Sequence, residues 1–237
     1  MKKIKSDILI IGAGLTGLMA AFAYSSLNTN IVIIDKLDFL SIKHNNADPR
    51  TTAIAEGSKQ FFEKIGIWEK IKKHAQPIID IKVIDRKPSR KINFSNSNKK
   101  QNLGYIIRNN ILKSVVLKNL QNKKNVKIIS NQSVSAIKNK NQFLECCFKN
   151  IKIETTLLIA SDGKNSRVRE IMKTPIYEKK YNQKALVVNF HHTGNHKSCA
   201  FELFFKSGPL AILPMKKVKN NRYSSSLIWS HKTNYIN

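Results

Sequence analysis

The chain has 237 residues, and 42 lysines and arginines against 15 aspartates and glutamates give it a formal net charge of +27. Its hydrophobic fraction of 41% supplies enough apolar surface for a packed core, which excludes a disordered polycation. Three cysteines, two of them adjacent, cannot form a disulfide framework and favour a reducing compartment, so we expect a cytoplasmic protein.

The first predicted elements form a βαβ unit. Short runs rich in β-branched residues predict buried strands over 7–11 and 31–34, and the residues between them predict a helix over 18–27. The glycine-rich turn Gly12-x-Gly14-x-x-Gly17 joins the first strand to the helix. Strand, glycine turn, helix and strand in this order are typical of a dinucleotide-binding unit.

The three glycines are what a dinucleotide requires of such a turn. Gly12 allows the tight turn, Gly14 lets the backbone approach a pyrophosphate, and Gly17 lets the helix pack close to the strands. Asp35 ends the second strand, where its carboxylate can accept hydrogen bonds from ribose hydroxyls. An acid at this position disfavours a 2′-phosphate, so we predict FAD or NAD rather than NADP.

The next segments extend an α/β pattern. We predict a helix over 56–65 that resumes at 68–71, a helix over 110–120, a strand over 126–129, a hairpin of 134–137 with 143–148, and a buried strand over 156–160. Arg50 precedes the first of these helices, where an arginine can pair with a phosphate. Asp162 and Gly163 follow the last strand, at the carboxyl end where open α/β sheets bind ligands.

Several segments occur in the order found in one enzyme family. They are Gly12-x-Gly14-x-x-Gly17, Asp48-x-Arg50-x-x-Ala53, Gly104-Tyr105-Ile106-Ile107-x-Asn109, Ala160-Ser161-Asp162-Gly163, Tyr181-x-Gln183-x-Ala185, Glu202-x-Phe204, Gly208-Pro209-Leu210-Ala211-Ile212-Leu213-Pro214 and Ser226-Leu227-Ile228-Trp229. With them the chain resembles the ubiquinone-biosynthesis hydroxylases, a branch of the FAD-dependent aromatic-ring monooxygenases. The resemblance covers essentially the whole chain, and the run from Gly208 to Pro214 is its most discriminating part.

The resemblance implies an α/β fold with two domains. A Rossmann-like FAD-binding domain would be discontinuous, over 1–75 and 102–176. A second, smaller β-sheet domain for the substrate, truncated at the C-terminus, would use 76–101 and 177–237, with strands over 78–84, 185–190, 200–205 and 224–230.

The resemblance also implies a set of cofactor-binding residues. Gly12, Gly14, Gly17 and Asp35 would hold the ADP half of FAD, Arg50 would lie beside the flavin and the pyrophosphate, and Asp162 with Gly163 would lie near the FAD and the nicotinamide site. Arg108 stands where the family usually has a glutamate, and a cation there can still meet a phosphate. The resemblance assigns no catalytic side chain and no metal, which suits an enzyme whose cofactor carries the chemistry.

The implied activity is hydroxylation of a polyprenylated aromatic ring in ubiquinone biosynthesis, with NAD(P)H as electron donor and oxygen as co-substrate. The alternative is a catalytically inactive fragment that binds FAD or another nucleotide. An NAD-dependent dehydrogenase would leave the run from Gly208 to Pro214 unexplained.

We expect peripheral contact with the inner face of a membrane, because the implied substrate is apolar and the chain is basic. Other hydroxylase or biosynthetic-complex subunits are expected partners, and nucleic acid is not, because the lysines are scattered without arginine clusters.

Family members continue beyond the point that matches Trp229 with a second Gly-Asp or Gly-Asn segment and Ala-Ala-His, which close over the flavin. No such segment follows in these 237 residues, so we interpret the chain as the N-terminal part of such an enzyme. The face on which the remaining part would dock should be apolar, and an isolated fragment is expected to bind FAD poorly.

Histidine and cysteine do not suggest further chemistry. His191 and His192 are adjacent and would point to opposite faces of a strand, which is not a metal-ligand spacing. Cys146 and Cys147 would also alternate between faces, so we expect one of them to be buried rather than redox-active.

Overall fold

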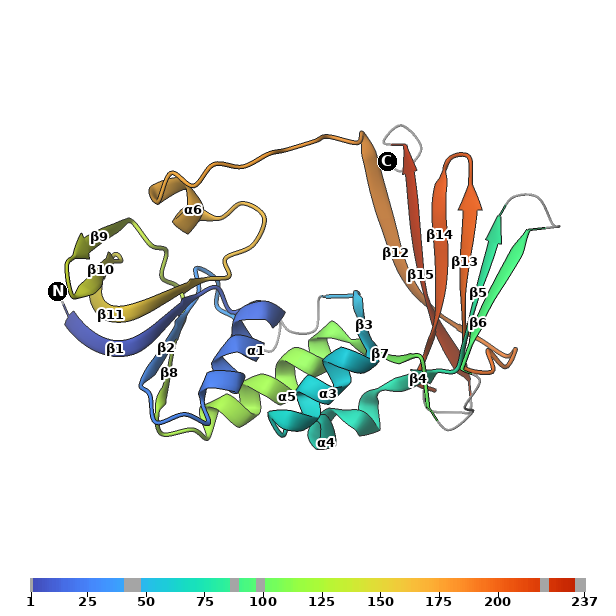
Figure 1. Cartoon of the computed structure of the whole chain (residues 1–237), viewed down its shortest axis with the longest axis horizontal. Coiled ribbons are helices and arrows are strands. Elements are labelled where there is room, and N and C mark those ends of the chain that lie inside the picture. The colour runs from blue at the N-terminus through green and yellow to red at the C-terminus, as the bar shows by residue number, and fades with distance from the viewer. Residues whose placement is uncertain (1, 41–47, 86–89, 97–100, 218–221, 233–237) are drawn as a thin grey trace. The chain divides into compact units, whose positions relative to one another are not determined.

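The computed structural model describes residues 2–40, 48–85, 90–96, 101–217 and 222–232 (Figure 1). The chain forms two compact units: residues 1–48 with 112–177, and residues 49–111 with 178–237. Each unit is built from two separate stretches of sequence, and each is described by itself below.

The first unit is built on a six-stranded sheet in the order β8-β2-β1-β11-β10-β9. Four neighbouring strands run parallel: β8 (Val126–Ile129), β2 (Ile31–Ile34), β1 (Lys2–Ile11) and β11 (Ile151–Ala160). The antiparallel hairpin of β9 (Ala136–Lys140) and β10 (Phe143–Cys147) extends the sheet beyond β11. This is the predicted α/β arrangement, and β1 is longer than predicted because it pairs with β11 from Lys2 onward.

The helices of the first unit follow its parallel strands. Helix α1 (Leu15–Tyr24) packs on β1 and β2 through Leu18, Ala21 and Phe22, which are buried. Helix α6 (Arg167–Ile171) is a short helix after β11, and α5 (Asn109–Gln121) leads into β8. One apolar core of the unit joins alternate residues of β1 and β2 to the β9–β10 hairpin and α6: Leu9, Ile11, Val32, Ile34, Val134, Cys146, Phe148, Ile153 and Val168.

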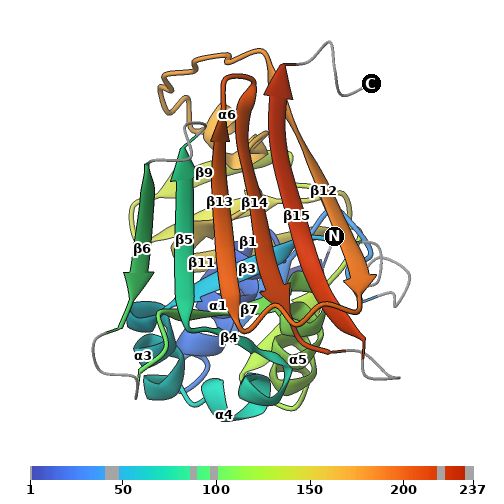
Figure 2. The same ribbon diagram turned by 90° about the vertical axis from the view of Figure 1, so that its right-hand side faces the viewer.

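The second unit contains a six-stranded sheet in the order β12-β15-β14-β13-β5-β6 (Figure 2). Its strands are β5 (Asp80–Asp85), β6 (Lys91–Ser95), β12 (Gln183–His192), β13 (Cys199–Phe205), β14 (Gly208–Met215) and β15 (Tyr223–Lys232). All neighbours pair antiparallel except β5 and β13, which are parallel. The family-like run from Gly208 to Pro214 is therefore a central strand of this sheet.

A three-stranded antiparallel sheet, β3-β7-β4, completes the second unit. It consists of β3 (Thr51–Ala55), β4 (Gln76–Ile78) and β7 (Gly104–Arg108). Between β3 and β4 lie helix α3 (Glu56–Lys64), helix α4 (Trp68–Ile71) and the 3-10 turn η1 (Lys72–His74). Apolar residues join one face of the six-stranded sheet to this small sheet: Ile78, Ile81, Leu103, Ile106, Ala200, Leu213 and Met215.

The structure corrects one predicted strand. The apolar run over 78–84 is not continuous, because it is split at Ile79 between two sheets. Strand β4 pairs with β7, whereas β5 pairs with β13 and β6, and the Ile79 amide donates to the Ser198 carbonyl oxygen. Hydropathy alone is uniform across this break, so the change of sheet has no signal in the run itself.

The boundaries of the two units also differ from those expected for the two domains. The expected boundaries at 75/76 and 101/102 become breaks after Asp48 and Ile111, and the last lies after Tyr177. Residues 49–75 and 102–111 group with the second unit because β3 and β7 pair with each other and with β4.

Candidate dinucleotide-binding site

The glycine turn lies at the carboxyl end of β1, between β2 on one side and β11 on the other. Gly12 has a φ of +107°, and a Cβ there would collide with the backbone of Ser161. A Cβ on Gly17 would collide with the carbonyl oxygen of Gly12. These two glycines are therefore required by the fold, because the turn, α1 and the end of β11 approach one another too closely for a side chain.

Gly14 is different, because the fold does not require a glycine there. Its φ of −67° and ψ of −178° are open to any residue, and a built Cβ has no neighbour within 4 Å. Gly14 is the N-cap of α1, and no side chain caps this helix end. The backbone N–H groups of the first turn are left for an external acceptor, and an anion is favoured at this end of a helix.

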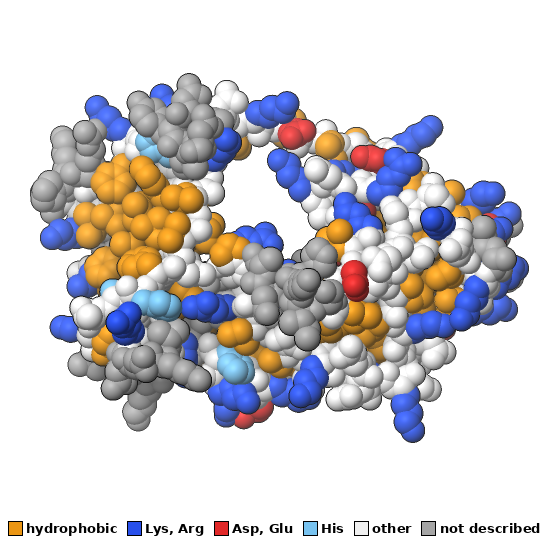
Figure 3. All heavy atoms as spheres, turned by 180° about the vertical axis from the view of Figure 1, so that it is seen from behind, with side chains coloured by type: hydrophobic (Ala, Val, Ile, Leu, Met, Phe, Trp, Pro, Cys, Tyr) orange, Lys and Arg blue, Asp and Glu red, His pale blue; other side chains and the backbone are white. Residues whose placement is uncertain are grey.

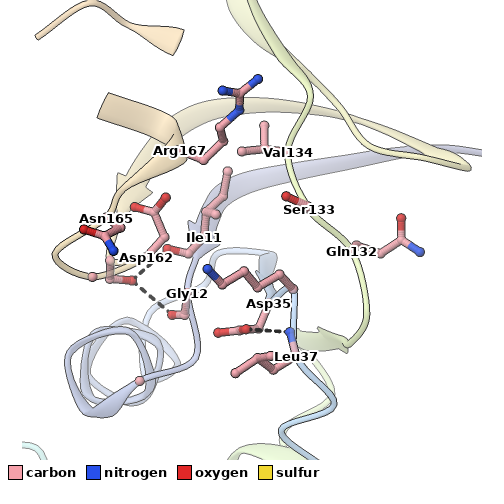
Figure 4. A pocket seen from close by; sticks show the side chains of 14 residues that line it. Ile11, Gly12, Asp35, Leu37, Gln132, Ser133, Val134, Asp162, Asn165 and Arg167 are labelled. Carbon is pink, nitrogen blue, oxygen red and sulfur yellow. Dashed lines mark hydrogen bonds between the residues drawn. The ribbon is translucent and has the colours of Figure 1, made fainter. Parts of the chain in front are cut away.

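Asp35 is held by the backbone on both of its carboxylate oxygens. Its Oδ2 accepts from the Ala13 amide at 2.6 Å. Its Oδ1 accepts from the Leu37 amide at 2.8 Å, a bond that Figure 4 draws. The carboxylate is thus fixed at the carboxyl end of β2, beside the glycine turn. Each oxygen retains a lone pair, so the group can still accept from a hydroxyl as well.

The carboxylate of Asp162 accepts hydrogen bonds from residues at the start of α6. Its Oδ1 accepts from the Ser166 hydroxyl at 2.6 Å, and its Oδ2 accepts from the Val168 amide at 3.1 Å. The neighbouring Ser161 hydroxyl bonds to the carbonyl oxygens of Ile11 and Gly12, at 3.1 and 3.0 Å. The Ser161–Asp162 segment therefore links the glycine turn to α6, because Ser161 bonds to the turn and Asp162 bonds to the helix. Gly163 follows with a φ of +89° and open space around its Cα.

A cavity of about 230 Å³ lies between these elements, and all of its walls belong to the first unit. Gly12, Gly14, Asp35, Asp162 and Gly163 line it (Figure 4). Further lining residues that the sequence reasoning did not single out are Lys36, Leu37, Gln132, Ser133, Asn165 and Arg167. Lys36 had an available signal, because it directly follows the predicted ribose-binding acid.

Arg50 and Arg108 lie in the second unit, at one end of the β3–β7 pair. Arg108 is opposite Thr51 in the ladder, and the Asn109 amide donates to the Arg50 carbonyl oxygen at 3.0 Å. The Thr52 hydroxyl and the Asn109 side chain bond at 2.6 Å and tie the same end together. The structure thus brings the two arginines together in the second unit and gathers the other six predicted residues in the first.

The groups whose pKa departs from its ordinary value do not line the cavity among the described residues. Burial raises the pKa of the Glu202 carboxyl and lowers that of the His196 imidazole, and both lie in the second unit. The described residues also hold no group of three or more His, Cys, Asp or Glu side chains that could bind a metal. The cavity therefore offers hydrogen bonds and charge to a ligand rather than a catalytic dyad.

Cys146 provides a prediction about pH. Burial raises the pKa of its thiol from 9.0 to about 12, and the neighbouring Cys147 adds to the effect. The folded state keeps this thiol neutral while the unfolded chain ionises it above pH 9. Its contribution to stability is therefore complete below pH 9 and is lost as the pH rises toward 12.

At pH 8 we expect a thiol reagent to label Cys147 and to leave Cys146 unlabelled until urea unfolds the protein, as peptide mass spectrometry would show. Equal labelling of both in the native protein would contradict the burial of Cys146.

The comparisons with known proteins decide between FAD and NAD. A family model described as "FAD binding domain" matches residues 5–235. The chain belongs to this family. FAD is therefore the cofactor, and the prediction of an FAD-binding α/β protein is confirmed.

The chain is also similar to curated ubiquinone hydroxylases. The ubiquinone hydroxylase UbiL of Rhodospirillum rubrum is 28% identical over 98% of this chain, and UbiM of Neisseria meningitidis is 24% identical over 92%. The ubiquinone biosynthesis monooxygenase COQ6 of Dictyostelium discoideum is 26% identical over 94%. The chain spans about half the length of these relatives, at 53%, 49% and 52%.

Solved flavin monooxygenases share the fold of this FAD binding domain. The p-nitrophenol 4-monooxygenase PnpA of Pseudomonas putida superposes with a TM-score of 0.80 at 15% identity, over 98% of this chain and 59% of its own. The flavin-dependent monooxygenase PieE, solved in complex with FAD and substrate, gives 0.75 at 12% identity, over 97% and 43%.

The residues present fit FAD. The open space at Gly14 and the uncapped first turn of α1 suit a pyrophosphate, and the fixed carboxylate of Asp35 suits a ribose.

The described residues include no helix long and apolar enough to cross a membrane.

The hydrogen bonds of Asp35 predict the behaviour of an Asp35→Asn variant. The asparagine retains one acceptor oxygen, and its NH₂ group would face a backbone N–H. We expect a loss of about 1–3 kcal/mol in the free energy of unfolding, because one backbone N–H loses its hydrogen bond to a charged carboxylate. Urea titration followed by circular dichroism measures this. The control is Glu69→Gln, which removes an exposed ion pair with Lys72 and should cost under about 1 kcal/mol. Equal effects of the two substitutions would show that Asp35 does not fix the glycine turn.

Proposed function

We propose that this chain forms the FAD-holding portion and part of the substrate-binding portion of a monooxygenase that hydroxylates a polyprenylated aromatic ring in ubiquinone biosynthesis. The observation that supports the proposal is the similarity to ubiquinone hydroxylases over 92–98% of the chain, together with a formed dinucleotide cavity in the same chain. Bound FAD would supply the redox chemistry, taking electrons from NAD(P)H and passing them to oxygen.

The contribution of the chain is to hold and orient this cofactor. The first turn of α1 at Gly14 would donate backbone hydrogen bonds to the pyrophosphate, and Asp35 would accept from the ribose. Asp162 holds the start of α6 through its two hydrogen bonds, so its role would be to position the site.

The test uses a longer protein, in which this chain continues after Lys232 with the remaining part of Rhodospirillum rubrum UbiL, reconstituted with FAD. We expect consumption of NADH or NADPH that depends on a polyprenylated phenol in detergent micelles, and a product that mass spectrometry shows to have gained one oxygen atom. Oxidation of a different phenol with no reaction of the prenylated one would overturn the substrate. Colourless protein that FAD does not reconstitute would instead support the inactive-fragment alternative.

We also propose peripheral contact with an anionic membrane, supported by the net charge of +27. Co-sedimentation with vesicles of phosphatidylglycerol and phosphatidylcholine should be at least tenfold greater at 20 mM than at 500 mM salt, because screening removes the attraction. Vesicles of phosphatidylcholine alone are the control and should not bind. Binding that is absent at low salt, or equal on both kinds of vesicle, would contradict the proposal.

A further inference from the structure

The six-stranded sheet of the second unit has two apolar faces, and the three-stranded sheet of that unit packs on part of one of them. Alternate residues such as Ala200 and Leu213 pack on the three-stranded sheet. The residues between them point to the opposite side, which we call the outer face. It includes Leu186, Val188, Leu203, Phe205, Leu227 and Trp229. The side chains of Leu186, Val188 and Phe205 are 40%, 39% and 44% exposed.

The outer face is continuous rather than a set of isolated apolar residues. Leu186 is paired with Trp229, Val188 with Leu227, and Trp229 with Leu210, so the apolar side chains run across three neighbouring strands. Leu203 is paired with Leu210 and carries the surface onto β13. Figure 3 shows the hydrophobic side chains gathered into one patch with basic side chains at its border. Patches of this kind on a folded chain mark surfaces that another element covers.

We propose that the outer face is the docking surface for the part of the enzyme that the relatives possess and this chain does not span, whether that part is on the same polypeptide or a separate one. The inference rests on family membership and on the coverage of about half of each relative, and not on the proposed substrate. A sheet that is apolar on both faces needs a layer on each, and among the described residues of the second unit only the three-stranded sheet packs on it, on the face opposite the outer face.

Charge and hydrogen bonding disfavour the other occupants. A second copy of the chain would bring Lys82 and Lys184, which lie on the outer face, against their counterparts in a protein of net charge +27. A lipid surface would have to accept β12, which pairs only with β15 in the described sheet and so carries unpaired backbone groups along its other side. Such an edge does not enter hydrocarbon.

The main experiment compares the 237-residue chain with a longer protein that continues after Lys232 with the remaining part of Rhodospirillum rubrum UbiL. A Val188→Cys substitution in a Cys147→Ser background reports on the outer face, and Lys73→Cys on an exposed site of the same unit serves as the control. We expect maleimide labelling at position 188 to slow at least tenfold in the longer protein, with labelling at position 73 unchanged. Equal labelling rates at position 188 in the two folded proteins would overturn the proposal.

A second arm covers the case in which the joined protein does not fold. The remaining part of UbiL is then co-expressed as a separate chain. It should co-purify with the wild-type chain and be lost with Leu186→Ser/Val188→Ser. It should be retained with Ile92→Ser/Phe94→Ser, because these apolar residues lie on the opposite face and are more exposed, at 57% and 51%. Co-purification that is equal for both double variants, or absent with the wild type, would count against the proposal.

Two further outcomes would assign the outer face to a second copy of the chain or to a lipid surface, and either would overturn the inference. One is a dimer in sedimentation analysis that Leu186→Ser/Val188→Ser dissociates. The other is vesicle binding that survives high salt and is lost in the same double variant. None of these measurements depends on turnover, so a wrong substrate leaves the result on docking intact.

Discussion

A Gly14→Val variant is expected to lose FAD binding while the fold remains unchanged. The fold leaves space at this position, because a built Cβ has no neighbour within 4 Å and the backbone conformation suits any residue. The side chain would instead occupy the approach to the first turn of α1, where the pyrophosphate would lie. We expect the dissociation constant for FAD to rise about 100-fold or more, which is ~2.7 kcal/mol. Quenching of flavin fluorescence measures the affinity, with the affinity of the unchanged chain as the baseline.

The matched control is Gly194→Val in the second unit, where a Cβ also has open space and no positive φ is involved. It should change neither the FAD affinity nor the urea midpoint. If Gly14→Val lowers the urea midpoint and the FAD affinity together, the glycine serves the fold rather than the ligand. If it leaves the FAD affinity unchanged, the pyrophosphate does not lie at the end of α1.

The elements of the first unit could be predicted because local pattern and final structure agree there. The run over 31–34 is apolar at every position, and all four residues are buried in a parallel strand. The predicted strand over 126–129 is found with the same bounds. Parallel strands covered on both faces read as continuous apolar runs, so their signal is strong in the sequence alone.

The organisation of the second unit was harder to predict from the sequence, because it depends on pairing between distant segments. Thr51–Ala55 is a strand only because it pairs with Gly104–Arg108, and nothing in its own residues distinguishes it from a turn before α3. The break at Ile79 similarly follows from its bond to the Ser198 carbonyl oxygen. Pairing partners more than 50 residues apart leave no periodic signal in either segment.

Motif recognition located the site residues and left their contacts open. The motif places Asp162 beside the cofactor, and the structure shows both of its carboxylate oxygens already bonded to the start of α6. The motif gives Gly12 and Gly17 roles in the turn and in packing and Gly14 a role toward the ligand; in the structure a Cβ would collide with backbone at Gly12 and Gly17 and meets nothing within 4 Å at Gly14. These contacts form between segments that fold against one another, and a linear motif does not encode them.

This difference between the glycines predicts that Gly17→Ala will damage the fold. Alanine has the higher helix propensity, so in an open helical position the change would stabilise by about 1 kcal/mol at most. At Gly17 the new Cβ would collide with the carbonyl oxygen of Gly12, and the obstacle is backbone, which moves only if α1 shifts off the turn. The collision outweighs the propensity, so we expect a net loss of about 3 kcal/mol in the free energy of unfolding. Urea titration gives the sign and the size.

Gly57→Ala makes the same chemical change at the start of α3, where a Cβ meets nothing within 4 Å, and it should be neutral or stabilising. Opposite signs for the two substitutions would show that the contact with Gly12, and not glycine flexibility, sets the requirement at Gly17. A stabilising effect at both positions would mean that α1 can move away from the glycine turn at little cost. The close packing that aims the end of α1 at the cofactor would then not be needed to hold it.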